Sequence, residues 1–263
     1  MTSAFYFRAP NALLKTFCRL SGNHAADPPR LATAARFFIT KHPATAGIEI
    51  AIIYVIMSDM SDIGNSEIND VTKLIRQRFA QSAEVIEKTA QRHAERIARA
   101  AEIIVRSLRA GGTVFTFGNG GSASDAEHIA GELVGRFLAQ RPPLRAEALS
   151  ADIVSLTAIG NDYGYKNVFA RPLAAKGRAG DVAIALSTSG KSPNVIAALR
   201  LARQMGLKTI ALTGDGGGGC AELADILLDV PAKLSPRIQE AHAAMYHIIC
   251  ELVEANFTTP PKK

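Results

Sequence analysis

Apolar residues along the chain follow two patterns, one with helical spacing and one typical of short strands. Residues 66–110 contain neither Gly nor Pro, and their apolar positions recur at intervals of three and four residues, which predicts a helical arm of one or two helices. From residue 111 to residue 256, short β-branched and aromatic runs alternate with helical stretches. Such alternation predicts an α/β core with a parallel sheet that helices cover on both faces.

The individual elements follow from the same pattern. Buried strands are predicted near residues 113–117, 144–149, 182–186, 209–212 and 226–230. Helices are predicted after Ser122, over 153–159, over 166–176 with a break at Pro172, from Pro193 to about 205, and from Pro236 to about 256. Residues 161–164 are predicted to form a polar loop, and the glycines of 214–219 a flexible turn.

The helical arm carries apolar stripes that need a covering surface. One stripe consists of Val71, Leu74, Ile75, Phe79, Val85 and Ile86, and a second of Ile97, Ile103, Ile104, Val105 and Leu108. Two coverings stay open, namely a sister subunit and the chain's own sheet. The length of the arm favours the sister subunit.

The most informative stretch begins at the first strand of the core. A Gly-rich turn at 118–122 follows this strand, and Ser122 is predicted to cap the next helix. A strand, a Gly-rich turn and a helix N-terminus together form an anion site, because unpaired N–H groups and the helix dipole point at the turn. His128 and Glu132 lie four residues apart on that helix, so both side chains leave the same face and could bind a metal or transfer protons.

A second loop of this kind follows the strand at 182–186. It contains Ser187, Thr188, Ser189 and Gly190, and Ser192 precedes the next helix. Since ligands of parallel sheets bind at the carboxyl ends of the strands, the two loops are predicted to converge on one phosphate of a sugar phosphate. The dinucleotide pattern at Gly118, Gly120 and Ala123 lacks its acidic partner, and Gly190-Lys191-Ser192 lacks the first glycine of a P-loop.

Composition and charge narrow the class of protein. The chain has 263 residues, is 48% hydrophobic and carries a net charge of +6. Residues 1–56 contribute +4 of that charge, so the remainder is nearly neutral and predicts no nucleic-acid partner. No uncharged apolar stretch reaches the length of a membrane span. Three cysteines without a C-x-x-C spacing indicate a reducing compartment and therefore a cytoplasmic protein.

Residues 1–56 are predicted to be an N-terminal extension that is disordered or lies outside the fold, and residues 57–263 a single domain. The extension is basic, contains Pro10, Pro28, Pro29 and Pro43, and shows no sustained periodicity. Two interpretations stay open. One is an upstream segment, with Met57 or Met60 as the effective start, and the other is a transit or signal-like peptide in which 41–49 interrupts the apolar run.

Taken jointly, these motifs resemble the phosphoheptose isomerases (sedoheptulose 7-phosphate isomerases) of the SIS (sugar isomerase) domain family. The resemblance covers residues 62–256 and rests on the segments 118–122, His128 with Glu132, 135–136, 160–162, 187–190, and 238–240 with His247. It implies a flavodoxin-like sheet and a homotetramer. It also implies interconversion of sedoheptulose 7-phosphate and D-glycero-D-manno-heptose 7-phosphate, for the heptose of bacterial surface polysaccharides.

The resemblance also implies roles for individual residues. Substrate would contact Asn119, Gly120, Gly121, Ser122, Glu132, Arg136, Asn161, Asp162, Ser187, Thr188, Ser189, Ser192 and Gln239. Glu132 and His247 would be the acid/base pair of an aldose–ketose exchange through an enediolate. One zinc ion per subunit would be bound by His128, Glu132, Gln239 and His247.

Departures from the family pattern leave two alternatives. Ala123-Ser124 replaces a His-Cys pair of some members, Gly131 replaces an acid, and Pro236 stands where Asp is common. One alternative is an isomerase of another phosphosugar. The other is a non-catalytic regulator that resembles the replication-initiator-associating SIS protein, although such a protein lacks counterparts of Glu132 and His247, which are present here.

Gln239 and His247 lie eight residues apart on the last predicted helix, a rise of about 12 Å. Both would therefore have difficulty reaching one centre on His128 and Glu132 from a single copy of the helix. This spacing predicts that neighbouring subunits contribute to each site.

Overall fold

The structure, a computed structural model, describes residues 4–7, 35–38 and 65–258. Within the N-terminal extension, β1 (Ala4–Phe7) pairs antiparallel with β2 (Ala35–Phe38). The rest of the extension and the predicted boundary at residue 57 lie outside the described residues, so the predicted division of the chain stays a prediction. By its internal contacts the chain divides into the units 1–76 and 77–263.

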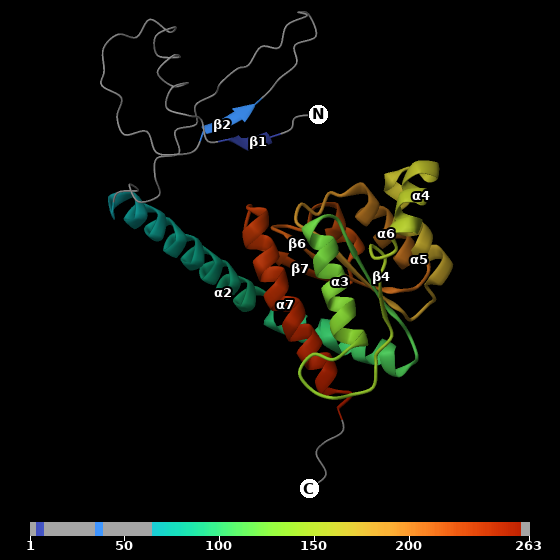
Figure 1. Cartoon of the computed structure of the whole chain (residues 1–263). Coiled ribbons are helices and arrows are strands. Elements are labelled where there is room, and N and C mark those ends of the chain that lie inside the picture. Colours follow the sequence, from blue (N-terminus) through green and yellow to red (C-terminus); the bar gives the residue numbers. More distant parts are fainter. Residues whose placement is uncertain (1–3, 8–34, 39–64, 259–263) are drawn as a thin grey trace, which may run out of the picture. The chain divides into compact units, whose positions relative to one another are not determined.

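A five-stranded parallel sheet forms the centre of the larger unit (Figure 1). Its order is β4-β3-β5-β6-β7, so the order reverses between β3 and β5. The strands are β3 (Val114–Gly118), β4 (Ala146–Ala148), β5 (Val182–Ser187), β6 (Lys208–Gly214) and β7 (Ile226–Val230). This is the flavodoxin-like order, and it confirms the predicted fold class.

Helices cover both faces of the sheet (Figure 1). The C-terminal part of α2 (Asn65–Arg109), α3 (Gly121–Val134) and α7 (Ser235–Ala255) pack on one face. The other face is covered by α4 (Ile153–Tyr163), α5 (Ala170–Lys176), α6 (Pro193–Gln204) and the short 3₁₀ helices η2 (Tyr165–Asn167) and η3 (Gly218–Leu223). No helix among the described residues is both long enough and apolar enough to cross a membrane.

The residues of β5 explain how the two layers differ. Val182, Ile184 and Leu186 point into the core beneath α2, α3 and α7, because alternate side chains of a strand face opposite sides. Ala183 and Ala185 point to the layer of α6. At β5, large side chains therefore face the first core, and small ones let α6 pack close to the sheet.

Several predicted boundaries agree with the structure and others are wrong. The arm is one helix, which ends before Gly111, and Gly111 has the positive φ of 82° that a helix C-terminus commonly requires. Ser122 does not cap α3, since the helix begins at Gly121 and Gly120 is its N-cap. The predicted break at Pro172 is instead a separate helix, α5, with Pro172 in its first turn, where no N–H is needed.

A buried ion pair closes the C-terminal end of α3. Arg141 and Glu254 approach within 3.2 Å, and their side chains are only 1% and 4% exposed. The guanidinium of Arg141 donates to the carbonyls of Glu132 at 2.6 Å and Leu133 at 2.9 Å, which satisfies the last turn of α3. The carboxylate of Glu254 accepts hydrogen bonds from the three backbone N–H groups of 137–139.

This geometry predicts a large effect of neutralising Glu254. Glu254→Gln leaves Arg141 buried without its counter-charge, so the free energy of unfolding should fall by about 3–5 kcal/mol. Burial alone would raise the pKa of Glu254, but the three N–H donors and Arg141 lower it from its ordinary value of 4.5. A lowered pKa contributes stability above the unfolded value, so the difference between wild type and variant should shrink as the pH falls below 4.5.

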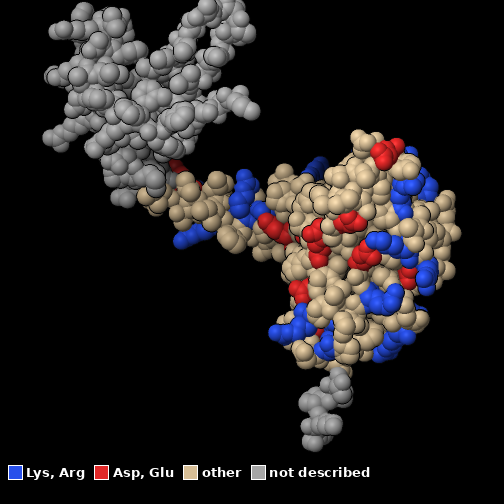
Figure 2. All heavy atoms as spheres, turned by 45° about the vertical axis from the view of Figure 1, so that its right-hand side comes forward, with Lys and Arg blue, Asp and Glu red and all other residues tan. Residues whose placement is uncertain are grey.

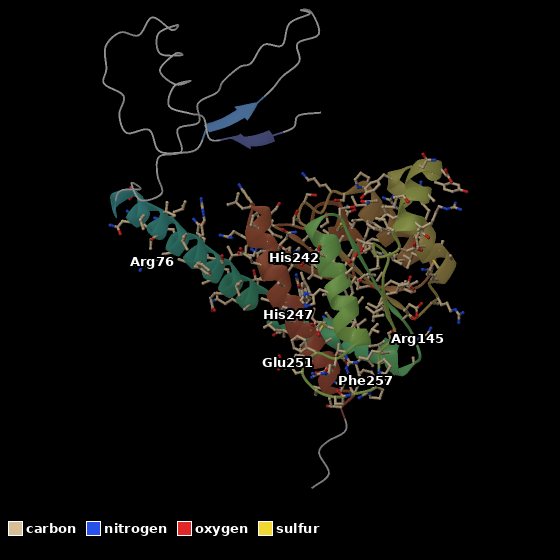
Figure 3. The ribbon with its side chains drawn as sticks, in the orientation of Figure 1. Arg76, Arg145, His242, His247, Glu251 and Phe257 are labelled. Atoms are coloured by element: carbon tan, nitrogen blue, oxygen red, sulfur yellow. The ribbon has the colours of Figure 1, made fainter. Side chains whose placement is uncertain are left out.

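Urea denaturation at one protein concentration and several pH values measures this difference. Glu251 is the matched control, since it is exposed on the same helix (Figure 3). Glu251→Gln should change the free energy of unfolding by less than about 0.5 kcal/mol. An equal effect of both substitutions would contradict the role assigned to Glu254.

Candidate active site

The two Ser- and Gly-rich loops lie side by side at the carboxyl edge of the sheet. They follow β3 and β5, which pair in parallel up to Gly118 opposite Leu186. In the second loop the hydroxyls of Ser187 and Ser192 are 3.1 Å apart, and Ser189 Oγ accepts from Lys191 N at 3.1 Å. The loops thus converge at the reversal of strand order, as predicted.

An amide pair joins the two loops. Asn119 Nδ2 donates to Asn194 Oδ1 at 2.9 Å, and Asn194 Nδ2 donates to Asn119 Oδ1 at 2.8 Å. Tyr165 adds a hydrogen bond from its hydroxyl to Asn119 Oδ1 at 3.2 Å. Asn194 and Tyr165 were not among the predicted site residues, because nothing in their local sequence indicates a partner 75 or 46 residues away.

Gln239 lies over the first loop. A Cβ atom added to Gly121 would fall 2.3 Å from Gln239 Nε2, so the glycine is what allows the amide of Gln239 to approach the backbone there. At the start of the same helix, the Ser235 hydroxyl is 3.5 Å from that of Thr188. The N-terminal end of α7 therefore adjoins both loops.

A cluster of aromatic and acidic side chains lies farther along α3 and α7, which pack against each other (Figure 1). His128 Nε2 is 3.1 Å from Glu132 Oε1, and the Tyr246 hydroxyl is 3.1 Å from His128 Nδ1. The ring of His247, on α7 in Figure 3, lies edge-to-face at 5.0 Å from that of His128 and stacks at 5.8 Å on Phe137. The predicted acid/base residues are thus brought together within one chain.

Burial and charge act on the pKa values in this cluster. Burial lowers the pKa of His247, the neighbouring His128 lowers it further, and Glu132 opposes the shift. Burial raises the pKa of Tyr246 to about 12, so its hydroxyl keeps its proton at neutral pH. Burial also raises the pKa of Asp125, against the effects of Tyr246 and His128.

Tyr246 has a second neighbour, since its hydroxyl lies 3.5 Å from Asp125 Oδ1. Because His128 Nε2 faces the acceptor Glu132 Oε1, this nitrogen carries the hydrogen in the observed arrangement, and Nδ1 accepts from the Tyr246 hydroxyl. In the other tautomer the hydroxyl donates to Asp125 and accepts from Nδ1–H, which leaves the lone pair of Nε2 for a metal. A carboxylate, a hydroxyl and an imidazole in this order resemble the outer contacts of metal-binding histidines. Two imidazoles and a carboxylate are ligands that zinc accepts, so the donor types of His128, Glu132 and His247 fit the ion.

The positions of these donors limit that fit. Among the residues that the structure describes, no three His, Cys, Asp or Glu side chains are grouped as a metal would need them. Gln239 lies at Gly121, about 12 Å of helix rise from His247. His247 lies next to His128 in the same chain, so no neighbouring subunit is needed to bring these two residues together. The contribution of neighbouring subunits to each site stays a prediction.

Three predicted substrate contacts make hydrogen bonds to residues outside the two loops. Arg136 is exposed beyond the end of α3 and donates to the carbonyl of Leu138 at 3.4 Å. Asn161 and Asp162, predicted in a loop, belong to the last turn of α4, where Asn161 donates to Asp162 at 2.8 Å. Asp162 lines a groove between α4 and α5, in which Arg171 lies 3.6 Å above the ring of Tyr163.

The glycines after β6 form the floor of the second loop rather than a flexible turn. Gly190 has φ 60°, and a Cβ atom there would fall 2.1 Å from the carbonyl oxygen of Gly217. Cys220 N donates to Gly190 O at 3.2 Å, and Gly214 N donates to Thr188 O at 3.1 Å. This support was missed because the Gly-rich composition of the turn indicates only conformational freedom.

Comparison with known proteins identifies relatives of this chain. Residues 77–214 match the family described as the SIS domain. The phosphoheptose isomerase of Rhodospirillum rubrum is 52% identical over 158 residues, which are 60% of this chain and 84% of the relative. The phosphoheptose isomerase of Thermodesulfovibrio yellowstonii is 46% identical over 185 residues, 70% of this chain and 92% of the relative.

A solved structure agrees with the sequence relatives. The phosphoheptose isomerase from Neisseria gonorrhoeae superposes with a TM-score of 0.67 at 39% identity. The match covers 70% of this chain and 99% of that structure, so the part of the chain without a counterpart lies outside the shared fold.

The amide pair between the loops gives a testable prediction. Asn194 is 2% exposed, so Asn194→Ala leaves the Asn119 amide with unpaired groups and should lower the free energy of unfolding by about 1–3 kcal/mol. Tyr165→Phe is the control, because it removes one exposed hydrogen bond and leaves the pair intact. Urea denaturation of both variants measures the difference, and equal effects would contradict the importance of the pair.

Proposed function

The chain belongs to the phosphoheptose isomerases of the SIS domain family, and we propose that its site interconverts sedoheptulose 7-phosphate and D-glycero-D-manno-heptose 7-phosphate. The observation that carries this proposal is the spacing of the two parts of the site. Gly121 in the phosphate loop and His128 in the cluster are seven residues apart on α3, a rise of about 10 Å. A seven-carbon sugar with its phosphate on C7 has its reacting carbons, C1 and C2, at the opposite end of an extended chain.

The loops supply neutral donors for the phosphate. Ser187, Ser189 and Ser192 provide hydroxyls, and the N-terminus of α3 provides the positive end of its dipole. Gly120, Gly121, Ser122 and Thr188 belong to the same two loops, and Gln239 reaches them from α7. Asn161, Asp162 and Arg136 are exposed and stay predicted contacts to the sugar.

Glu132 and His247 would carry the proton transfers. The isomerisation removes a proton from the carbon beside the carbonyl and returns it to the neighbouring carbon through an enediolate. A carboxylate can only accept, which suits Glu132 to the carbon proton. A neutral imidazole both donates and accepts, and the lowered pKa of His247 favours that neutral form, which suits it to the oxygen proton.

We assign one zinc ion per subunit to the cluster, with His128, Glu132 and His247 as its ligands. Gln239 lies at Gly121 in the same chain, so as the fourth predicted ligand it would have to come from a neighbouring subunit. Bound there, zinc would stabilise negative charge on the substrate oxygens as a Lewis acid. The support is the donor chemistry of the cluster and the Tyr246 hydroxyl, which contacts the Nδ1 atom of His128 and also lies 3.5 Å from Asp125 Oδ1.

Self-association, to a homotetramer, would cover α2. Ile68, Val71, Ile75 and Phe79 follow one stripe of this helix and are all exposed, with Phe79 at 74%. Apolar residues at intervals of three and four on an exposed helix are typical of helix-to-helix contacts between chains.

On the face that Figure 2 shows, basic and acidic side chains are interspersed rather than gathered into one basic surface.

The first test of this proposal is the substitution Glu132→Gln. It replaces a proton acceptor by a near isostere, so turnover of sedoheptulose 7-phosphate should fall by about 10²–10⁴-fold while the fold is kept. Glu127→Gln, at an exposed position on the same helix, should keep the wild-type rate. A Glu132→Gln protein with more than half of the wild-type rate would refute the assigned role.

A second test concerns zinc. Tyr246→Phe removes the hydroxyl that contacts His128 Nδ1, and loss of such an outer contact typically weakens metal binding about 10–100-fold. Competition with a zinc-chelating dye measures the dissociation constant independently of activity. The prediction fails if wild type and variant bind zinc equally, and the zinc assignment fails if the wild-type protein binds none.

A third test concerns assembly. Ile75→Asp places a charge in the exposed stripe of α2 and should shift the tetramer towards smaller species. Gln77 is exposed on the opposite side of the same helix, so Gln77→Asp should leave the mass unchanged. Size-exclusion chromatography with light scattering measures both, and a wild-type monomer would contradict the proposed tetramer.

A further inference from the structure

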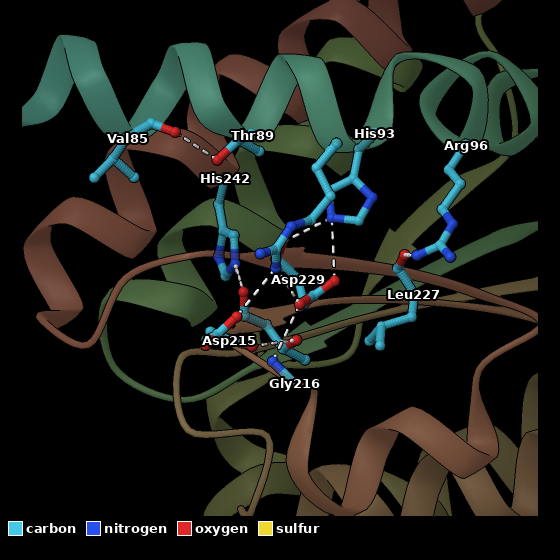
Figure 4. A network of polar contacts seen from close by, with 12 residues as sticks. Val85, Thr89, His93, Arg96, Asp215, Gly216, Leu227, Asp229 and His242 are labelled. Carbon is cyan, nitrogen blue, oxygen red and sulfur yellow. Dashed lines mark hydrogen bonds and ion pairs between the residues drawn. The ribbon is translucent and has the colours of Figure 1, made fainter.

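Four polar side chains meet where α2 passes the edge strand β7 (Figure 4). His93 is fully buried, and its Nε2 lies 2.7 Å from the carbonyl oxygen of Asp229 and 3.1 Å from Asp229 Oδ1. Both neighbours are acceptors, so Nε2 carries the hydrogen. Arg92, one residue earlier on α2, donates to Asp229 Oδ2 at 2.8 Å and to Asp215 Oδ1 at 3.0 Å.

The carboxylate of Asp229 also holds a loop on its other side. Gly216 N donates to Asp229 Oδ2 at 3.1 Å, so one oxygen receives both the guanidinium of α2 and the backbone of the β6–η3 loop. Burial alone would raise the pKa of Asp229, but the Gly216 N–H, Arg92 and His93 together lower it. Asp229 is therefore a charged link between α2 and this loop.

The loop that Asp229 holds is the floor of the substrate-binding loop 187–190. Gly216 and its two successors have positive φ angles, a path that few other residues would follow. Next along the chain, Gly217 and Gly218 contact the backbone of Ser189 and Gly190. A change in how Asp229 is held would therefore be passed directly to the Ser189–Gly190 backbone.

We infer that Asp229, held by Arg92 and His93, is a positioning residue that sets the conformation of loop 187–190 and thereby the affinity for the substrate phosphate. This inference rests on the proposed function only in taking that loop as the phosphate site. The hydrogen bonds of Asp229 are to Arg92, His93 and Gly216, and not to the acid/base residues Glu132 and His247. Its loss should therefore affect binding of the substrate rather than the chemical step. The arm helix α2 thus takes part in substrate binding without touching substrate.

The neighbouring arginines of α2 offer a matched pair for the test. Arg96, one turn after Arg92, donates to the carbonyl of Leu227 in β7 at 3.3 Å, so it contacts the same strand but not the loop (Figure 4). Arg92→Gln should raise KM for sedoheptulose 7-phosphate about 2–30-fold, the range found for substitutions along such a network, with kcat within a factor of two of wild type. Arg96→Gln should leave both constants unchanged. Because the Arg92 side chain is 42% exposed, its replacement leaves the core intact.

Equal kinetic constants for the two variants, or a fall in kcat without a rise in KM, would overturn the inference. If the wild-type protein does not turn over sedoheptulose 7-phosphate, the proposed function fails. Hydrogen exchange of the same proteins then tests whether Arg92 and Asp229 hold the loop, independently of any substrate. Faster exchange of the Gly214, Gly216 and Cys220 amides in Arg92→Gln than in Arg96→Gln would then support it. Identical exchange would overturn it.

Discussion

The parallel pairing of β3 with β5 is the constraint on which the site depends. Their register, from Val114 opposite Val182 to Gly118 opposite Leu186, makes both strands end at the same edge of the sheet. Because the chain leaves them in opposite lateral directions, to β4 on one side and β6 on the other, the loops that follow the two strands lie next to each other at this edge. The amide pair of Asn119 and Asn194 then holds these loops together.

Much of this framework could be predicted from residue patterns. The sheet, the helical character of the arm and the strand at 226–230 follow from periodicity, because each segment has a regular set of apolar positions. The pairing of His128 with Glu132 follows from their spacing on one helix. Boundaries near 120 and 161–172 were harder, since Ser122 and Pro172 fit more than one position of a helix start.

The residues that local patterns missed act through tertiary contacts. Asn194 looks like an ordinary helix residue, and its partner Asn119 is known only once β3 and β5 are paired. Asp229 looks like the polar position of an edge strand, yet it connects α2 with the loop under Gly190. A sequence pattern indicates whether a residue lies on the buried or the exposed face of its own helix or strand. It carries little information about which residues, distant in the sequence, will contact that residue in the fold.

The alanines of β5 have a consequence for the breadth of chemistry open to this fold. Ala183 and Ala185 let α6 lie close to the sheet, and the first turn of α6 carries Asn194. The position of Asn194, and with it the spacing of the two loops, therefore depends on the packing of the hydrophobic interior. Bulkier side chains in that layer would lift the helix and enlarge the opening without altering one polar group. Divergence towards bulkier phosphosugars could thus begin among residues that no ligand ever touches.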